Sequence, residues 1–208
     1  MPNQVGIQTS GDASIINPRS GKSGESVIAP AHGFYHEPVS RGVVFGGSIA
    51  GQVTTVGLAT TYTGLCLSNP ITSSVHLSLL SVGYNFIVAF AAGASVGLMT
   101  GYNSTTNVTH TTPVTPRNMK FVGSAGTGTG LLDSAATLPT APTLNLVFGA
   151  GLTGAITTTP MGLAGLQTID GLLLLPPGAY VAVYTSTASG TAAGAFSLTW
   201  EEIPSANI

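Results

Sequence analysis

Ionised side chains are scarce in this sequence: Lys, Arg, Asp and Glu together make up 6% of the 208 residues, whereas a soluble protein usually carries about a quarter. With five basic residues against seven acidic ones, the chain lacks the basic face that neutralises a nucleic-acid backbone, so we expect no nucleic-acid partner. Long solvent-exposed helices are excluded on the same ground, because their outer faces need Glu, Lys and Arg. Hydrophobic residues make up 43% of the chain, which excludes a disordered polar chain.

The small number of charged side chains bears on the solubility of the folded protein. A protein that faces water alone usually holds a net charge well away from zero, and this chain has a formal net charge of −2. We therefore predict that other subunits cover much of the surface, in a homo-oligomer or a larger assembly.

Cysteine is nearly absent as well. Cys66 is the single cysteine, which excludes an intrachain disulfide framework. Its flanking residues are apolar, a setting typical of a small buried hydrophobic side chain.

One uncharged run, residues 77–99, is long enough to span a bilayer. Ser and Gly interrupt it repeatedly, and no Lys or Arg lies within 15 residues of either end to orient a spanning helix. We interpret the run as buried strands joined by a glycine-rich turn, and we expect no membrane partner.

The charges that are present are distributed unevenly. Residues 1–41 hold half of all charged side chains and four prolines, whereas residues 42–116 hold no charge at all. This break predicts an extended N-terminal arm over residues 1–41 that leads into a β-sandwich domain over residues 42–208.

The body has the pattern of β-strands throughout. Short β-branched or alternating stretches are closed by Gly, Pro, Asn or Ser, a rhythm typical of a sandwich or barrel, and no window has the apolar stripe of an amphipathic helix. The predicted strands are Val43–Ile49, Gln52–Val56, Tyr62–Leu67, Val75–Val82, Asn85–Ala91, Ser95–Tyr102, Asn118–Val122, Leu144–Phe148, Gly154–Thr158, Gly171–Leu175, Ala179–Thr185 and Ala195–Glu201.

Two of these strands also predict which face is buried. In Ala179–Thr185 neither face is charged, so we expect the sandwich core to cover one face and a neighbouring subunit to cover the other. In residues 196–201, Phe196, Leu198 and Trp200 alternate with polar residues, which predicts one buried and one wet face.

Candidate metal ligands are few. His32 and His36 are spaced as i and i+4, which brings two imidazoles together only on a helix. Gly33 and Pro38 favour extended chain, in which the two histidines lie about 13 Å apart, so we expect polar contacts there, no metal site and no cofactor. His76 falls on the outer face of a predicted strand, where a hydrogen-bonded histidine is the simpler interpretation and a pH-sensitive subunit contact is the alternative.

Catalytic carboxylates have to converge across a cleft. Asp133 and Asp170 are the only acids between Arg41 and Glu201, and both lie in stretches typical of turns. Neither a phosphate-loop spacing nor a nucleophile-elbow spacing is present. We therefore predict that the protein is not an enzyme.

Two segments carry a family resemblance. Residues 62–77 contain an apolar strand, an Asn-Pro pair, a turn of small residues and a second apolar strand. Residues 172–185 contain a Leu-rich stretch, a Pro-Pro-Gly reversal and an uncharged strand, and residues 196–204 form a closing strand. In these segments the chain resembles the trimeric jelly-roll proteins on tailed-phage virions, which are similar in turn to the tumour-necrosis-factor and C1q type of jelly roll.

The resemblance implies an all-β fold, a jelly-roll β-sandwich with an extended N-terminal arm. It also implies a capsid decoration, cement or head-fibre protein, located as a homotrimer on the capsid surface of a virion with the major capsid protein as its partner. It brings no catalytic residues. We assign docking on the capsid lattice to Ile15, Ile16, Arg19 and Lys22 of the arm, so deleting residues 1–41 should leave a trimer that no longer binds shells.

Two other classes stay open. A carbohydrate- or receptor-binding tip exposes aromatic rings with Asn, Asp or Gln in one set of loops, and Tyr102, Asn103, Asn107 and His110 form such a grouping. A hydrolase on the same fold needs converging acids or histidines, for which the two aspartates of the body are the candidates.

Overall fold

The structure is a computed structural model of the chain, and it describes residues 8–9, 15–16, 33–86, 93–120, 128–151, 164–188 and 194–207. Contacts divide the chain into two compact units, Met1–Glu37 and Pro38–Ile208. In the first unit, two short strands pair antiparallel, β1 (Gln8–Thr9) and β2 (Ile15–Ile16).

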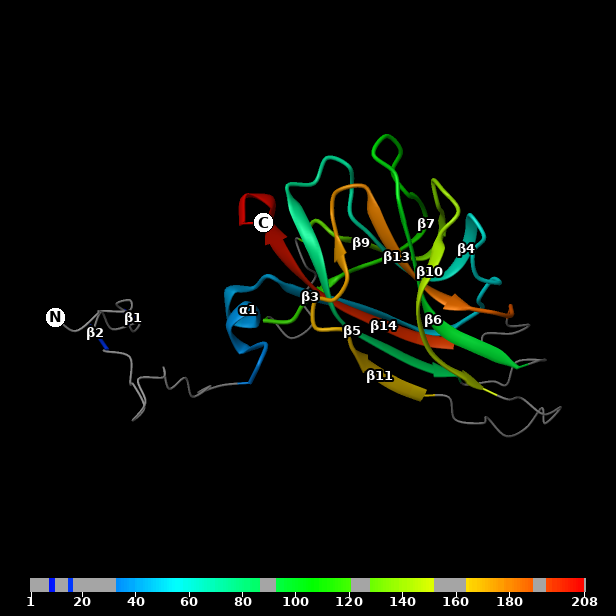
Figure 1. The fold of residues 1–208 in the computed structure, drawn as a ribbon, viewed down its shortest axis with the longest axis horizontal. Coiled ribbons are helices and arrows are strands. Elements are labelled where there is room, and N and C mark those ends of the chain that lie inside the picture. The colour runs from blue at the N-terminus through cyan, green and yellow to red at the C-terminus, as the bar shows by residue number, and fades with distance from the viewer. Residues whose placement is uncertain are drawn as a thin grey trace, which may run out of the picture. The chain divides into compact units, whose positions relative to one another are not determined.

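The second unit is built mainly from β-strands (Figure 1). In chain order they are β3 (Val44–Gln52), β4 (Thr61–Ser68), β5 (Val75–Phe86), β6 (Ala94–Tyr102), β7 (Thr109–Val114), β8 (Arg117–Asn118), β9 (Leu131–Thr137), β10 (Thr143–Gly151), β11 (Ala164–Thr168), β12 (Leu174–Leu175), β13 (Ala179–Thr185) and β14 (Gly194–Pro204). A short helix, α1 (His36–Arg41), precedes β3 in the sequence, and a 3-10 turn, η1 (Ser205–Asn207), follows β14.

The strands form two antiparallel sheets. The first, called here the β10–β7 sheet, has the order β10-β6-β13-β4-β9-β7, and the second, the β11–β8 sheet, has the order β11-β5-β14-β3-β8, with β12 also paired to β5. The first strand of the sandwich, β3, thus lies beside the last, β14, and β4 lies beside β13. This arrangement is the jelly roll of two Greek keys, so the predicted all-β jelly-roll sandwich is confirmed.

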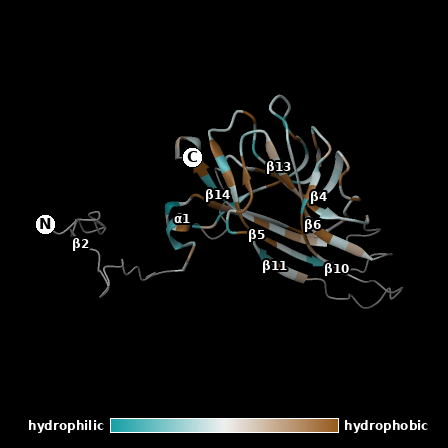
Figure 2. Ribbon diagram, in the orientation of Figure 1, coloured by the Kyte–Doolittle hydropathy of each residue, from teal (hydrophilic) through white to brown (hydrophobic). Residues whose placement is uncertain are grey.

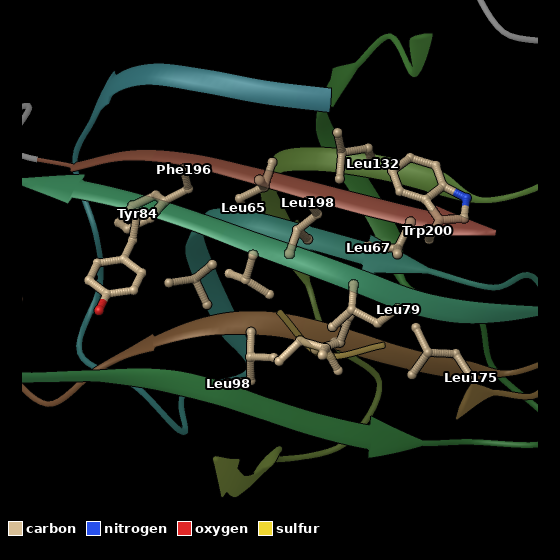
Figure 3. Close-up of a cluster of buried hydrophobic side chains, with 14 of the residues drawn as sticks. Leu65, Leu67, Leu79, Tyr84, Leu98, Leu132, Leu175, Phe196, Leu198 and Trp200 are labelled. Carbon is tan, nitrogen blue, oxygen red and sulfur yellow. The ribbon is translucent and has the colours of Figure 1, made fainter. Parts of the chain in front are cut away.

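The main core lies between the two sheets. Figure 3 shows Leu65 and Leu67 of β4 beside Leu198 of β14, and Leu98 of β6 and Trp200 of β14 belong to the same buried cluster. All five side chains are fully buried, and each buried leucine contributes about 1.5–3 kcal/mol relative to an exposed one. The predicted alternation along residues 196–201 is confirmed, since buried and half-buried residues alternate along β14.

A second, smaller core covers the opposite face of the β10–β7 sheet. Its buried members are Tyr62, Cys66, Met99, Val108, Ala136, Leu138, Tyr180 and Ala182. Both faces of β13 are therefore covered, as predicted, and residues of the chain itself pack on the second face. Cys66 is a free, buried thiol in this cluster, as its apolar flanks predict.

The prediction of two strands in residues 75–91 is wrong over the described part, because β5 runs unbroken from Val75 to Phe86. Gly83 lies between the two predicted strands, and a Cβ added there would lie 2.4 Å from Ser197 Oγ. The glycine allows a close approach between neighbouring strands, and it does not reverse the chain.

Other predicted strands are shorter than expected. Residues 53–56 are irregular, and in Gly171–Leu175 only Leu174 and Leu175 are extended, since Gly171 sits in a turn with a φ of 81°. In Asn118–Val122 only Asn118 is a described strand residue, and Gly154–Thr158 lies outside the described residues. Strands β7, β9 and β11 were not predicted.

The uncharged run of residues 77–99 supplies most of β5 and β6, as the strand interpretation predicts. Among the described residues, no helix has the length and apolar character needed to cross a membrane.

The expectation of extended chain around Pro38 is wrong, because α1 begins at His36 and includes the proline. Pro38 falls in the first helical turn, where the missing N–H has no partner to lose. The N–H of His36 donates to the carbonyl of Gly33 at 2.9 Å, and Glu37 and Arg41 lie at the helix ends that suit their charges. Figure 2 shows the hydrophilic colour over this helix and paler or brown segments along the strands.

Candidate functional site

A histidine and a buried aspartate meet on the last two strands of the β10–β7 sheet. Asp133 lies on β9, paired with Cys66 of β4 on one side and Pro113 of β7 on the other, and it is fully buried. Nδ1 of His110, on β7, lies 2.5 Å from Asp133 Oδ2, and 29% of the His110 side chain is exposed. The other carboxylate oxygen, Oδ1, is buried without a hydrogen-bond partner among the described residues.

The surroundings of this carboxylate solvate charge poorly. Burial raises the pKa of Asp133, and the hydrogen bond and charge of His110 act against that increase. Burial, and then the negative charge of Asp133, raise the pKa of the Cys66 thiol far above its usual value. Burial raises the pKa of Tyr62 in the same way. Cys66 is therefore a protonated, unreactive thiol.

The carboxylate also determines what the imidazole can do. A neutral His110 that carries its proton on Nδ1 donates it to Asp133 and keeps a free lone pair on Nε2. Carboxylates orient histidines in this way where the second ring nitrogen acts on a ligand or a substrate. Because Nδ1 is occupied, Nε2 is the ring nitrogen available to a bound molecule.

His110 forms part of the wall of a cavity of about 210 Å³ beside the ends of β4 and β13. The wall combines polar groups with small apolar side chains. It consists of Ser68, Asn69, Pro70, Asn107, Val108, His110, Leu131, Gly178 and Ala179.

Two turns that carry the family resemblance meet at this cavity. Asn69, in the turn after β4, donates through Nδ2 to the carbonyls of Val75 at 2.8 Å and Leu175 at 2.9 Å. The N–H of Gly178, in the Pro-Pro-Gly turn, donates to the carbonyl of Asn69 at 2.8 Å. Gly178 has a φ of 88°, and a Cβ there would lie 2.4 Å from the carbonyl oxygen of Asn103. Glycine is therefore required at the point where the turns approach.

The grouping predicted for a carbohydrate- or receptor-binding tip is divided in the structure. Asn107 and His110 line the same cavity, whereas Tyr102 lines a separate cavity of about 350 Å³ together with Leu174. Asn103 Oδ1 is not available to a ligand, because it accepts hydrogen bonds from two backbone N–H groups of its own turn. The structure adds Ser68 to the first cavity, a residue that the sequence did not single out.

The two aspartates of the body do not come together. The prediction that Asp133 lies in a turn is wrong, because the residue is inside β9, with its strand neighbour Leu132 in the main core. Asp170 is exposed in a turn with a φ of 49°, as its sequence context predicts. The pair proposed for a hydrolase therefore does not form a site.

The remaining histidines are His32, His36 and His76. His32 lies outside the described residues, and His36 begins α1. No group of three or more His, Cys, Asp or Glu side chains that could hold a metal ion occurs in the part of the chain that the structure describes. His76 is half-buried on β5 opposite Ile203, and its buried Nδ1 has no hydrogen-bond partner in the part of the chain that the structure describes.

Of the four residues assigned to capsid docking, Ile15 and Ile16 form β2. Arg19 and Lys22 lie outside the described residues. Docking through these residues stays a prediction.

The His110–Asp133 pair was not predicted from the sequence because neither of the strands on which it lies, β7 and β9, was predicted. Residues 109–114 contain three threonines and a valine, which favour a strand, but Pro113 argues against one. The proline is tolerated because β7 is the terminal strand of its sheet.

Comparisons with known proteins give no match to this chain, whether with family models, with curated proteins or with solved structures.

Proposed function

We propose that the chain is a virion structural protein, a jelly-roll protein that forms a homotrimer and decorates the capsid surface, with the major capsid protein as its partner. The observation that carries this proposal is the strand order, with β3 beside β14 and β4 beside β13. That order is the architecture implied by the resemblance to trimeric virion proteins. The separation of Met1–Glu37 from the sandwich by contacts supports a docking role for the N-terminal segment.

One face of the sandwich supports self-association. On β14, residues Ser197 and Thr199 point away from the core, and Ser81 of β5 pairs with Thr199. A Cβ added at Gly83 would meet Ser197 Oγ, so the glycine lies on this same outer face. A face of small, uncharged side chains allows the backbone of a neighbouring subunit to pack closely.

A different surface of the same subunit offers apolar side chains. On β10, at the end of the β10–β7 sheet, Leu144 is 41% and Val147 is 59% exposed. Exposed apolar side chains on a terminal strand are typical of interaction sites. Two unlike surfaces on one subunit associate head to tail, and such contacts close into a ring when the rotation between subunits allows it.

The mass of the intact assembly tests the proposal most directly. Native mass spectrometry at micromolar concentration should give about three times the 20.8 kDa mass of one chain. A well-behaved monomer at that concentration would contradict the proposal. The role of the N-terminal segment is tested by sedimenting the full chain, and a chain lacking residues 1–41, with purified shells of the virus from which the chain comes. The shortened trimer should stay in the supernatant.

A further inference from the structure

The stability of the fold does not explain the His110–Asp133 pair. In a chain with seven acidic residues, one of them is placed at zero exposure with an oxygen that has no hydrogen-bond partner among the described residues. A buried carboxylate lowers stability unless hydrogen bonds satisfy both of its oxygens. The pair instead holds one imidazole in a fixed orientation with Nε2 facing away from the carboxylate.

Three groups on the cavity wall keep hydrogen-bonding capacity for a ligand. His110 Nε2 is an acceptor in the neutral ring. The Ser68 hydroxyl is held by a contact of 3.5 Å to the carbonyl of Leu131, which is at the outer limit of a hydrogen bond, so it can turn toward a ligand. Asn107 accepts a hydrogen bond from the N–H of Ile71 through Oδ1 at 2.8 Å, which leaves its Nδ2 group as a donor.

The volume of the cavity and the apolar side chains of its wall further limit which ligands can bind. Pro70, Val108, Leu131 and Ala179 supply apolar contacts. The volume of about 210 Å³ lies below the range of roughly 300–1,000 Å³ that holds drug-sized ligands. A molecule that fits is a single ring, with C–H groups against the apolar wall and hydroxyls toward the polar groups.

Charge disfavours an ionised ligand. No Lys or Arg belongs to the cavity wall, and the carboxylate of Asp133 lies directly behind His110. A carboxylate or phosphate ligand would therefore meet no permanent positive charge. A hydroxyl group, by contrast, both donates to Nε2 and accepts from the Ser68 and Asn107 donors.

We propose that this cavity binds a neutral, hydroxyl-rich ring of the size of one monosaccharide, with His110 Nε2, Ser68 and Asn107 as its hydrogen-bonding groups. This inference goes beyond the proposed assembly role, which needs no ligand site. Asp133 is a positioning residue, because it acts on the ligand only through His110.

The test uses the full chain with isotope-labelled histidine and follows the His110 ring resonances by NMR. Glucose, galactose, mannose and N-acetylglucosamine are the neutral probes, and glucuronate is the anionic comparison. We expect saturable shifts of the His110 resonances with at least one neutral sugar. Ser68→Ala should weaken that binding by about 3- to 10-fold, the effect of one lost hydrogen bond.

Ser134→Ala is the matched control, because it also removes a serine hydroxyl of the same sheet that bonds a carbonyl, that of Thr112 at 3.3 Å, but it lies outside the cavity wall. Its affinity should equal that of the wild type. His110→Gln should lose binding, with circular dichroism recorded to show that the variant is folded.

Three results would overturn the proposal: no neutral sugar shifts the His110 resonances at tens of millimolar, glucuronate binds more tightly than every neutral sugar, or Ser68→Ala and Ser134→Ala bind equally. The mass of the assembly is measured on the same samples. A monomer that binds a sugar contradicts the assembly proposal alone, and a trimer that binds none contradicts the ligand site alone.

Discussion

The carboxylate of Glu202 accepts a hydrogen bond from the backbone N–H of Gly130 at 2.8 Å, across 72 residues of sequence. It also accepts the N–H of Thr129, at 2.8 Å and 3.0 Å to its two oxygens. Glu202 is 8% exposed, so these bonds form away from water. They attach the segment that leads into β9 to the last strand of the sandwich.

Replacing Glu202 by Gln should therefore destabilise the protein. The amide oxygen of Gln can still accept a hydrogen bond, but the amide NH₂ in place of the second oxygen cannot accept one from a backbone N–H. The NH₂ group is then a buried donor without an acceptor, which costs about 1–3 kcal/mol. Urea unfolding at neutral pH measures the loss. Glu201→Gln is the control, because Glu201 is half-buried on the outer face of the same strand; it should change the unfolding free energy by less than about 0.5 kcal/mol. Equal effects of the two substitutions would show that Glu202 does not hold the segment.

The dependence of stability on pH should report the burial of Asp133. Its folded pKa is raised above the ordinary 3.8, so above about pH 4 the unfolded chain loses the proton before the folded chain does. The contribution of this group is complete below that pH and declines as the pH rises toward the folded pKa. Asp133→Asn removes the carboxyl group, so the stability of this variant should improve relative to the wild type as the pH increases from about 4.

Urea unfolding at a series of pH values measures this difference. Asp170→Asn gives the same chemical change at an exposed turn, and its curve should run parallel to that of the wild type. A parallel curve for Asp133→Asn would mean that the buried carboxyl group does not influence folding in this pH range.

Gly178 should be intolerant of a side chain. Alanine at a φ of 88° is strained, and its Cβ would lie 2.4 Å from a backbone oxygen, so we expect Gly178→Ala to cost at least about 1–3 kcal/mol. Gly149→Ala is the comparison, because a Cβ at Gly149 meets no atom within 4 Å. Its unfolding midpoint should stay close to that of the wild type, and a similar loss in both variants would contradict the steric explanation.

A charged side chain on the exposed apolar surface of β10 should dissociate the proposed oligomer. Val147→Glu places a carboxylate on β10, where the proposed contact would have to desolvate it. We expect the mass measured by light scattering at micromolar concentration to fall toward that of one chain, with an unchanged circular dichroism spectrum. Thr111→Glu, on β7 at the other end of the same sheet, should leave the mass unchanged. If both variants keep the assembly intact, the contact lies elsewhere.

Several strands of the sandwich could be predicted because apolar and polar residues alternate along each strand. The bounds of Ala179–Thr185 agree with those of β13, and the inward positions of Phe196, Leu198 and Trp200 agree with the core. Each of these predictions depends only on residues that are neighbours in the sequence, because successive side chains of a strand point to opposite faces of the sheet.

The His110–Asp133 pair could not be predicted in this way. It depends on the register of β7 against β9, which shifts twice between His110 and Pro113. Such irregularities are set by packing between distant segments, and no local pattern announces them. The residues that pack on the second face of β13 could not be predicted for a related reason. Some of them, such as Val108 and Leu138, lie outside the strands.

Pro113 gives the end of the β10–β7 sheet a further property. A strand from another molecule that tried to add alongside β7 would meet a ring nitrogen with no hydrogen to offer, so the ladder could not continue in register. Copies held at high local density would then stay discrete particles, and sheet-to-sheet polymerisation into fibrils through this strand would be blocked by a single residue.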